Sequence, residues 1–252
     1  MTEDGFSAGE SAIAAFLLAD SRLPSGAYSH SAGLEPAVMA GLGVDGVYPY
    51  LLSRLQSVVR METVAAVLAH RRARAWAGVV QAGGQAVQEN GQATPDDGVP
   101  GFSALETALD ARTPSAAQRD ASRRLGRGML RLAATLKPAD AAVAALKTEV
   151  PRPTRPVALG VAARALGVGE LQLARLACYD DAQSVVAAAL KLLPIDPMTA
   201  TGWILAAEET INVVAANALQ ARSLEDLPAL SAPWMEHWAE AHTERTRRLF
   251  VA

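Results

Sequence analysis

Reactive side-chain types are densest between Asp20 and Glu35, where the chain reads DSRLPSGAYSHSAGLE. Ser29 and Ser31 flank His30, so one hypothesis is a helical serine hydrolase that uses either serine with His30 as base and Asp20 or Glu35 as orienting acid. Adjacent residues on a helix point about 100° apart, which works against that geometry. The competing interpretation is a helix N-terminus with Ser29 as N-cap. The spacing favours the second interpretation.

A glycine pattern, GxGxxG, occurs at Gly41, Gly43 and Gly46. In dinucleotide-binding proteins this pattern follows a strand and opens a helix, so that the helix N-terminus meets the pyrophosphate. Here a helical segment precedes it. The pattern therefore predicts a helix-ending turn rather than a nucleotide site.

Metal-ligating residue types are few and poorly spaced. The chain has one cysteine, Cys178, and four histidines at positions 30, 70, 237 and 242. No two histidines have the i, i+4 spacing that places both on one helix face, so neither a metal site nor a cofactor is expected from this chain alone. The alternative is that His237 or His242, on the surface, binds a metal ion together with a partner or symmetry mate. The single cysteine also excludes a disulfide framework.

The composition bounds the fold and the class of protein. Of 252 residues, 50% are hydrophobic, 19% charged and 5% aromatic. Alanine is abundant, and it is the best helix former and a poor strand residue, so we expect an all-α, single-domain bundle of about ten helices with one long flexible loop. A net charge of −3 argues against a nucleic-acid partner. No apolar run is long enough for a membrane helix, and the acidic start lacks the basic region of an export signal, so the expected location is cytoplasmic.

Apolar periodicity, capping residues and the positions of glycine and proline predict the helices. They cover residues 11–19, 29–40, 47–80 (one long or one broken helix), 103–111, 115–136, 139–149, 157–166, 170–192, 199–220 and 233–247. In the first of them Ile13, Phe16 and Leu17 form an apolar stripe. Residues 81–101 are rich in Gly, Gln, Pro and Asp, which predicts an exposed, mobile loop within one domain of residues 1–252.

The predicted helix over residues 115–136 is the most amphipathic of the chain. Its apolar stripe consists of Leu125, Met129, Leu132 and Leu136. The opposite side carries Arg119, Arg123, Arg124, Arg127 and Arg131. This arginine face is a solvated surface, a contact for nucleic acid, or a contact for an acidic protein surface; the overall acidic balance disfavours nucleic acid.

Two further features indicate packing or partner surfaces. Residues 245–252 (RTRRLFVA) form a basic tail with Leu249 and Phe250 near its end, which either docks in the groove of a partner or packs against the core of the chain itself. Runs of small residues at 185–189 and 211–218 permit close helix packing, either inside the core or across a homodimer.

The segment LLADSRLPSGAYSHSAGLE, residues 17–35, closely resembles the N-terminal signature of the UreF family of urease accessory proteins. In that family a D-S-x-L-P turn leads into G-x-F/Y-S-H-S-x-G-L-E. Downstream, RDASRRLGRGMLRLA resembles the family's central helix, AALKLLPID around Lys191 resembles its later basic-apolar-Pro turn, and RRLF at the end resembles its C-terminal R-L-F. The chain departs from the pattern at Arg155, where the family usually has histidine, in the turn PIDPMTATGW, and in an expanded 81–101 loop.

The resemblance implies an all-α scaffold that is not an enzyme. Family members form homodimers, bind the accessory protein UreD (also called UreH), and recruit the nickel-carrying GTPase UreG. The assembly docks on apo-urease, assists nickel insertion and modulates GTP hydrolysis, with no nucleic acid and no membrane involved. The resemblance makes the signature, the arginine face and the tail the expected partner-binding regions. The residues expected to bind partners are Pro24, Gly26, Tyr28, Ser29, His30, Ser31, Glu35, Arg123, Arg127, Lys191, Arg247, Arg248, Leu249 and Phe250.

Overall fold

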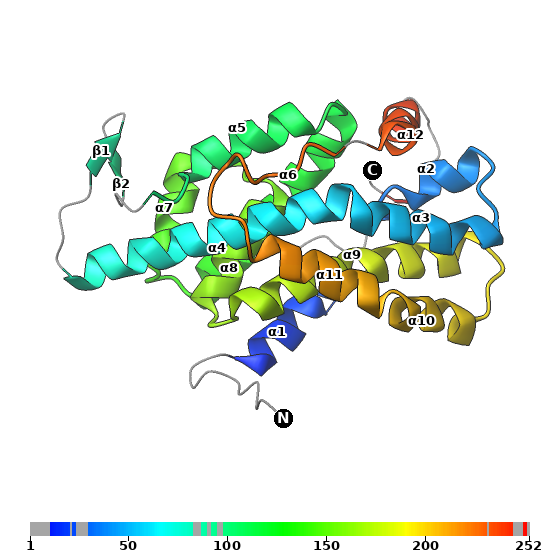
Figure 1. Cartoon of the computed structure of the whole chain (residues 1–252), viewed down its shortest axis with the longest axis horizontal. Coiled ribbons are helices and arrows are strands. Elements are labelled where there is room, and N and C mark those ends of the chain that lie inside the picture. Colours follow the sequence, from blue (N-terminus) through cyan, green and yellow to red (C-terminus); the bar gives the residue numbers. More distant parts are fainter. Residues whose placement is uncertain are drawn as a thin grey trace.

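Helices form nearly all the regular structure in the computed structural model, which describes residues 11–20, 22–23, 30–82, 87–89, 92–94, 98–230, 232–243 and 249–250 (Figure 1). The helices are α1 (Ala12–Ala19), α2 (Leu34–Met39), α3 (Val44–Gln56), α4 (Val58–Ala82), α5 (Phe102–Arg112), α6 (Ala116–Leu136), α7 (Ala141–Glu149), α8 (Arg155–Ala165), α9 (Glu170–Leu192), α10 (Pro197–Ala206), α11 (Glu208–Ala218) and α12 (Pro233–Thr243). The two strands β1 (Val87–Glu89) and β2 (Gln92–Thr94) pair antiparallel.

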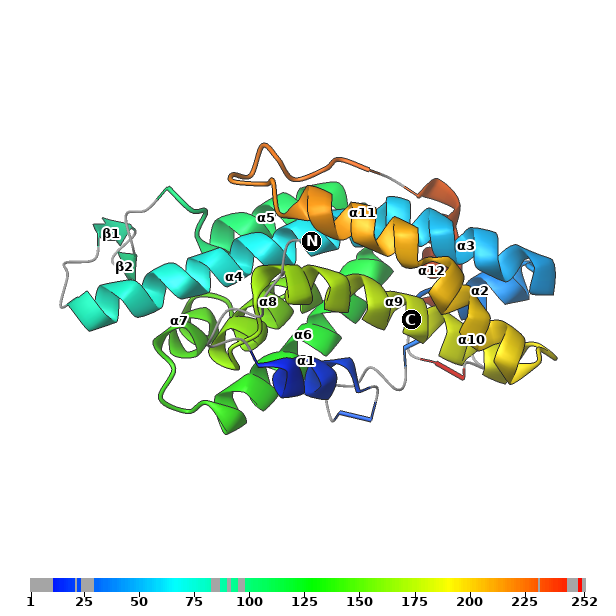
Figure 2. The ribbon, with the colours of Figure 1, turned by 60° about the horizontal axis from the view of Figure 1, so that its bottom comes forward.

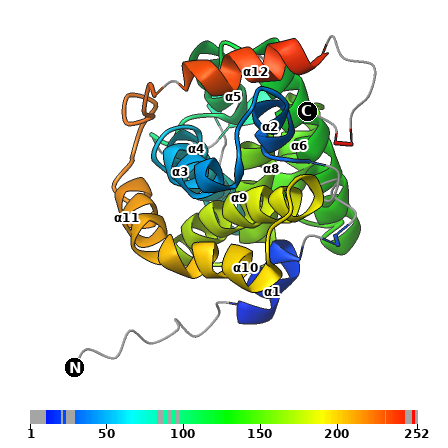
Figure 3. The same cartoon turned by 90° about the vertical axis from the view of Figure 1, so that its right-hand side faces the viewer.

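Three helices, α4, α8 and α9, organise the core. The 25-residue α4 runs along the long axis and packs against α8 and α9, and α8 packs in turn against α6. Seen end-on, α9 lies among α3, α10, α11 and α2 (Figure 3). It connects two hydrophobic clusters: its N-terminal half packs with α4, α8 and α5, and its C-terminal half packs with α2, α3 and α11. Turning the molecule shows α1 and α11 on opposite sides of this core (Figure 2).

Glycine allows the central helices to approach closely. A Cβ added to Gly160 of α8 would lie only 2.2 Å from the carbonyl oxygen of Ala66 and 2.9 Å from the Cβ of Ala69, both in α4. A Cβ added to Gly126 of α6 would lie 2.1 Å from the carbonyl oxygen of Pro153, just before α8. Only glycine fits at either contact.

The all-α prediction is confirmed, and several helix bounds agree closely with the structure. The helix predicted over residues 170–192 matches α9 at both ends. Ser115 caps α6 by accepting the N–H of Gln118, and Asp140 caps α7 by accepting two amides. These ends were predictable because Ser and Asp side chains satisfy the free N–H groups of a first turn.

Of the two alternatives for residues 47–80, one long or one broken helix, the structure has the broken helix: the backbone of Ser57 (φ −118°, ψ −94°) leaves the helical region between α3 and α4. Two other local predictions are wrong. The helix over 199–220 is two helices, α10 and α11, which meet at Ala207. Inside the segment 81–101, which was expected to be loop, β1 and β2 form a short ribbon. The mobility of this segment stays a prediction.

Helix α1 forms where expected but turns its apolar stripe outward. Ile13 and Phe16 are 76% and 71% exposed, whereas Ala14 and Leu18 are the buried residues of α1. Within the described residues, no helix is both long and apolar enough to cross a membrane. The outward stripe of α1 is therefore an exposed apolar surface on the protein.

Candidate functional site

The signature segment contains a sharp backbone turn after His30. Ala32 and Gly33 have φ values of 49° and 75°, a left-handed conformation that residues other than glycine rarely adopt. Helix α2 therefore begins at Leu34, and the helix predicted from residue 29 is wrong over residues 30–33. Tyr50 of α3 fixes the turn: its hydroxyl donates to the Ala32 carbonyl oxygen at 2.8 Å and leaves no room for a Cβ on Gly33.

Glu35, in the first turn of α2, contacts the C-terminal residues of the chain. Its carboxylate accepts hydrogen bonds from the backbone N–H groups of Leu249 at 2.7 Å and Phe250 at 3.0 Å. Nε2 of His242, in α12, lies 3.2 Å from the same carboxylate. Glu35 and His242 are both buried, so the idea of His242 as a surface metal ligand is wrong. The fold thus brings the signature and the tail together although they are 214 residues apart.

Leu249 and Phe250 lie in different environments. Phe250 is 5% exposed and belongs to the hydrophobic cluster that includes Leu34. Nζ of Lys191, near the end of α9, lies 5.0 Å from the Phe250 ring centroid, which is cation–π geometry. Leu249 is 74% exposed. Of the two alternatives for the tail, packing on the chain's own core holds for Phe250, while Leu249 is left at the surface.

Several of the expected partner-binding residues lie outside the described residues. These are Pro24, Gly26, Tyr28, Ser29, Arg247 and Arg248. Their role in binding stays a prediction.

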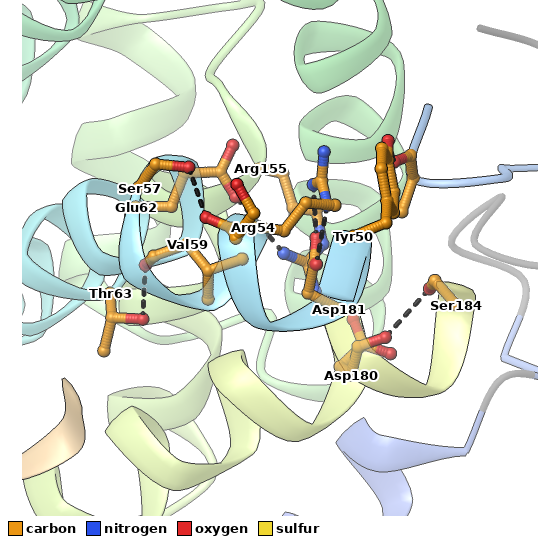
Figure 4. Close-up of polar contacts among 12 residues, drawn as sticks. Tyr50, Arg54, Ser57, Val59, Glu62, Thr63, Arg155, Asp180, Asp181 and Ser184 are labelled. Carbon is orange, nitrogen blue, oxygen red and sulfur yellow. Dashed lines mark hydrogen bonds and ion pairs between the residues drawn. The ribbon is translucent and has the colours of Figure 1, made fainter. Parts of the chain in front are cut away.

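A second set of polar side chains lies in the core where α3, α4, α8 and α9 meet (Figure 4). Arg54 of α3 and Asp181 of α9 form two hydrogen bonds of 2.9 and 2.6 Å. Arg155, the first residue of α8, pairs with Asp180 of α9, and its guanidinium also lies 3.7 Å from the carboxylate of Glu62 in α4. Two guanidinium groups therefore face three carboxylates in this charged cluster.

Burial and pairing shift the pKa values of this cluster in opposite directions. Burial raises the pKa of Glu62. Burial alone would also raise the pKa of Asp181, but the guanidinium groups of Arg54 and Arg155 outweigh it and lower that pKa. Arg155 stands where the resembled family usually has histidine. Because arginine stays protonated at physiological pH, it balances these carboxylates where a histidine would titrate.

A small cavity of about 80 Å³ adjoins the charged cluster. Its lining includes His30 from the signature, Arg54, Glu62 and Arg155 from the cluster, and Arg119 from α6. The volume has room for several water molecules. His30 is therefore placed beside buried charges, and its own charge helps to lower the pKa of Asp181.

The hydrolase alternative gains no support from the acids that were offered for it. Asp20 forms an ion pair with Arg22 at 2.7 Å, and that pairing lowers the pKa of Asp20 to about 2. The two carboxylate oxygens of Glu35 each accept a hydrogen bond from a tail amide. Ser31 is fully buried, and its Oγ lies 3.5 Å from the backbone N–H of Glu35. Ser31 thus supports the turn into α2.

Metal-ligating groups are dispersed in the described part of the chain, where no three His, Cys, Asp or Glu side chains are grouped to hold an ion. The thiol of Cys178 is buried in α9, and burial raises its pKa to about 11. Its Sγ lies 3.5 Å from Oγ1 of Thr63.

The arginine face of α6 divides into paired and exposed side chains. Arg123 pairs with Asp110 of α5 at 2.6 Å, and Arg119 donates to the carbonyl oxygens of Thr113 and Pro114. The exposed arginines are Arg124, Arg127 and Arg131. The apolar stripe predicted for this helix is wrong at its end, because Leu136 is exposed and Leu130 and Ala133 are buried instead. The shift follows from Gly126, which turns its side of α6 toward α8.

The charged cluster was missed by reasoning from the sequence alone, although a signal was present. Asp181 follows Cys178 by three residues and precedes Ala182 on an apolar side of α9, and Arg54 lies between Leu51 and Leu55. A charged residue on an otherwise apolar helix face is expected to be paired in the core, because unpaired charges are rarely buried. The pattern predicts such a pair but not its partner.

Comparison with known proteins defines the class as helical accessory proteins of urease maturation. The family model described as UreF matches residues 44–208. The urease accessory protein UreF of Mycobacterium marinum is 35% identical over 235 residues, which cover 93% of this chain and 96% of that protein. The UreF of Mycolicibacterium vanbaalenii is 35% identical over 94% of this chain and 96% of its own length, and that of Mycobacterium tuberculosis is 33% identical over 93% and 96%.

The chain belongs to the UreF family. The family-model match begins after the signature segment and ends before α12, whereas the matches to the mycobacterial proteins span nearly the whole chain. The role of a urease accessory protein follows from this membership.

Proposed function

We propose that this chain is a non-catalytic scaffold that bridges a UreD-like (UreH) protein and a UreG-like GTPase on apo-urease. In this role it assists nickel insertion and modulates GTP hydrolysis. The proposal is supported by the UreF membership and by the way the reactive side chains are used: Glu35 binds backbone amides, and Ser31 supports a turn. In the described part of the signature, these two side chains serve the backbone of the fold rather than a nucleophile.

Two separate exposed apolar surfaces carry the proposal. Ile13 and Phe16 of α1 form one, and Leu249, whose backbone N–H binds Glu35 beside His242 of α12, marks the other. Helices α1 and α12 lie on opposite sides of the core in Figures 1 and 3. Exposed aromatic and aliphatic anchors of this kind mark protein interfaces. A scaffold with separated surfaces holds two partners at once without competition between them.

The exposed arginines of α6 support a third contact, with an acidic protein surface. Arg127 is exposed, whereas Arg123 is held by Asp110. Arginine suits such a contact because its planar guanidinium binds carboxylates through two hydrogen bonds. Within the proposal, Arg127 contacts the partner and Arg123 holds α5 against α6.

The proposal includes a homodimer. The small-residue run at 185–189 packs mainly inside the core, whereas the run at 211–218 has one buried side and one exposed side, so the contact between copies uses the exposed side of α11. A shallow groove lined by Leu205 of α10 and by Val213 and Ala216 of α11 supports this, since Leu205 and Val213 are exposed apolar residues. Sedimentation of the chain alone is expected to give the dimer mass at micromolar concentration.

The scaffold is tested by co-purification with the UreD-like and UreG-like proteins encoded with the same urease. The double variant Ile13→Asp, Phe16→Asp and the single variant Leu249→Asp are each expected to lower the capture of one partner at least about tenfold, because an aspartate cannot be buried in an apolar contact. Each variant is expected to retain the other partner. Met198→Asp, at an 80% exposed position on α10, is the matched control and is expected to retain both. Full capture of both partners by both variants would contradict the proposal.

A further inference from the structure

In the contact between Glu35 and the tail, one carboxylate accepts hydrogen bonds from two consecutive backbone amides. One carboxylate oxygen accepts from the N–H of Leu249 at 2.7 Å, and the other accepts from the N–H of Phe250 at 3.0 Å. The first distance is at the short end of the range for N–H to oxygen hydrogen bonds, and the second is ordinary. The contact recognises the backbone and so fixes where the tail lies whatever its side chains.

This pair of hydrogen bonds also determines which tail side chain faces the core. With both amides directed at Glu35, Phe250 enters the hydrophobic cluster beneath Lys191, and Leu249 remains 74% exposed. Released from Glu35, Leu249 and Phe250 would lose the two backbone hydrogen bonds that hold them in their present places in the described part of the chain. The exposure of the Leu249 side chain therefore depends on the backbone conformation that Glu35 holds.

Glu35 in turn depends on the tail. Its side chain is buried, and a buried carboxylate is costly unless donors satisfy it. The two tail amides supply two donors, and His242 lies 3.2 Å away on a third side. Tail and signature therefore order each other across the whole length of the chain.

We propose that Glu35 is a positioning residue that holds the tail in the conformation that presents Leu249 to an accessory partner. This inference rests on the proposed function, in which Leu249 docks one of the two partners. Glu35 itself, being buried, acts through the tail and touches no partner.

The matched test compares Glu35→Gln with Glu106→Gln. Both residues are buried glutamates, and Glu106 of α5 also accepts two hydrogen bonds, but from the N–H and Oγ1 of Thr154 at the start of α8 rather than from the tail. Glutamine keeps the size and one acceptor oxygen but turns an NH₂ toward a backbone N–H. Both variants therefore lose one buried carboxylate, but only Glu35→Gln loses it at the contact with the tail.

Selective ¹⁵N-phenylalanine labelling gives a direct readout, because the chain has four phenylalanines. In Glu35→Gln only one acceptor oxygen remains, so at least one of the Leu249 and Phe250 amides, the former followed by ¹⁵N-leucine labelling, is expected to exchange with solvent at least about tenfold faster, while the amide of Phe102 in α5 is unchanged. In Glu106→Gln both tail amides are expected to keep their wild-type rates. Wild-type protection of both tail amides in Glu35→Gln would overturn the proposal.

Partner capture then separates positioning from a merely structural role. Glu35→Gln is expected to lower capture of whichever partner Leu249→Asp loses, and to add nothing further in the Leu249→Asp background. Independent losses in the double variant would overturn the proposal while leaving the scaffold intact. If Leu249→Asp alone loses no partner, the proposed function fails at the tail whatever Glu35 does.

A second variant covers the case in which Glu35→Gln does not fold. Phe250→Ala frees the tail from its other end without touching Glu35. It is expected to speed exchange of the Leu249 amide, followed by ¹⁵N-leucine labelling, and to lower capture of the same partner. Unchanged exchange and capture in Phe250→Ala would contradict the proposal.

Discussion

The contact between α4 and α8 and the contact between α2 and the tail both join distant parts of the chain, but they do so by opposite means. The first depends on the absence of a side chain at Gly160, which lets two helix backbones meet. The second depends on one carboxylate, Glu35, that binds two amides near the surface. The comparison shows a rigid centre built from small residues and a peripheral polar contact that opens at lower cost.

The largest loss of stability is expected from a substitution in the rigid centre. Gly160→Ala would place a Cβ 2.2 Å from the Ala66 carbonyl oxygen, and neither backbone can rotate away. We expect a loss of about 4 kcal/mol or more in the free energy of unfolding, measured by thermal unfolding followed by circular dichroism. Gly202→Ala is the matched control, since nothing lies within 4 Å of its new Cβ in α10. An unchanged melting temperature in Gly160→Ala would remove the rigid-centre side of the comparison.

A smaller loss of stability is expected when an ion pair of the charged cluster is broken. This cluster is polar like the tail contact but buried like the centre. Arg54→Met leaves the Asp181 carboxylate buried without its two hydrogen bonds. We expect a loss of about 3–5 kcal/mol in urea denaturation, with much of it recovered in Arg54→Met, Asp181→Leu. Arg123→Met, which breaks the partly exposed pair with Asp110, is expected to cost less than about 1 kcal/mol. Equal losses in the two single variants would show that burial of the pair does not matter.

The smallest expected effect depends on pH and on Glu106. Burial raises the pKa of Glu106 to about 7, against the lowering influence of the Thr154 hydrogen bonds and of Arg123. Because the folded protein then holds this proton more tightly than the unfolded chain, stability from this group is present at low pH and is lost as pH rises toward 7. The loss between pH 4.5 and 7 is at most about 3 kcal/mol, and Glu106→Gln removes it.

Urea denaturation of both proteins at pH 5 and pH 8 measures this dependence. Glu106→Gln is expected to be more stable than the wild-type chain at pH 8 and close to it at pH 5. A wild-type protein whose difference from Glu106→Gln is the same at both pH values would contradict the raised pKa. The result also sharpens the comparison with Glu35, whose carboxylate accepts hydrogen bonds from amides near the end of the chain rather than from a residue that caps a helix.

Helix type and many helix ends were predictable because they depend on local chemistry. The apolar pattern and flanking Gly169 delimit α9, and Ser115 and Asp140 cap the helices that follow them. A break within residues 47–80 was one of two alternatives, but its place at Ser57 was not predictable, and neither was the break at Ala207, which lies in good helix-forming sequence. Tertiary packing overrides local propensity at such positions.

The candidate site was predictable as a set of segments but not as an arrangement. The signature, Lys191 and the tail were singled out separately, and the fold places Glu35, Lys191 and Phe250 in one neighbourhood. Their meeting depends on long-range packing that no local spacing encodes. The orientation of α1 failed for a related reason: its stripe of Ile13 and Phe16 has helical period, but periodicity does not say whether the core or a partner covers it.

The burial of Cys178 has a practical consequence for experiments on the tail. The chain has no other cysteine, and this thiol is enclosed in α9 with a pKa raised to about 11, so it forms little thiolate at neutral pH. A cysteine introduced at exposed position 249 would therefore react with a maleimide dye while the native thiol stays silent. The fold thus permits background-free fluorescent labelling of the tail at position 249, and with it an optical readout of whether the tail stays in place in Glu35→Gln.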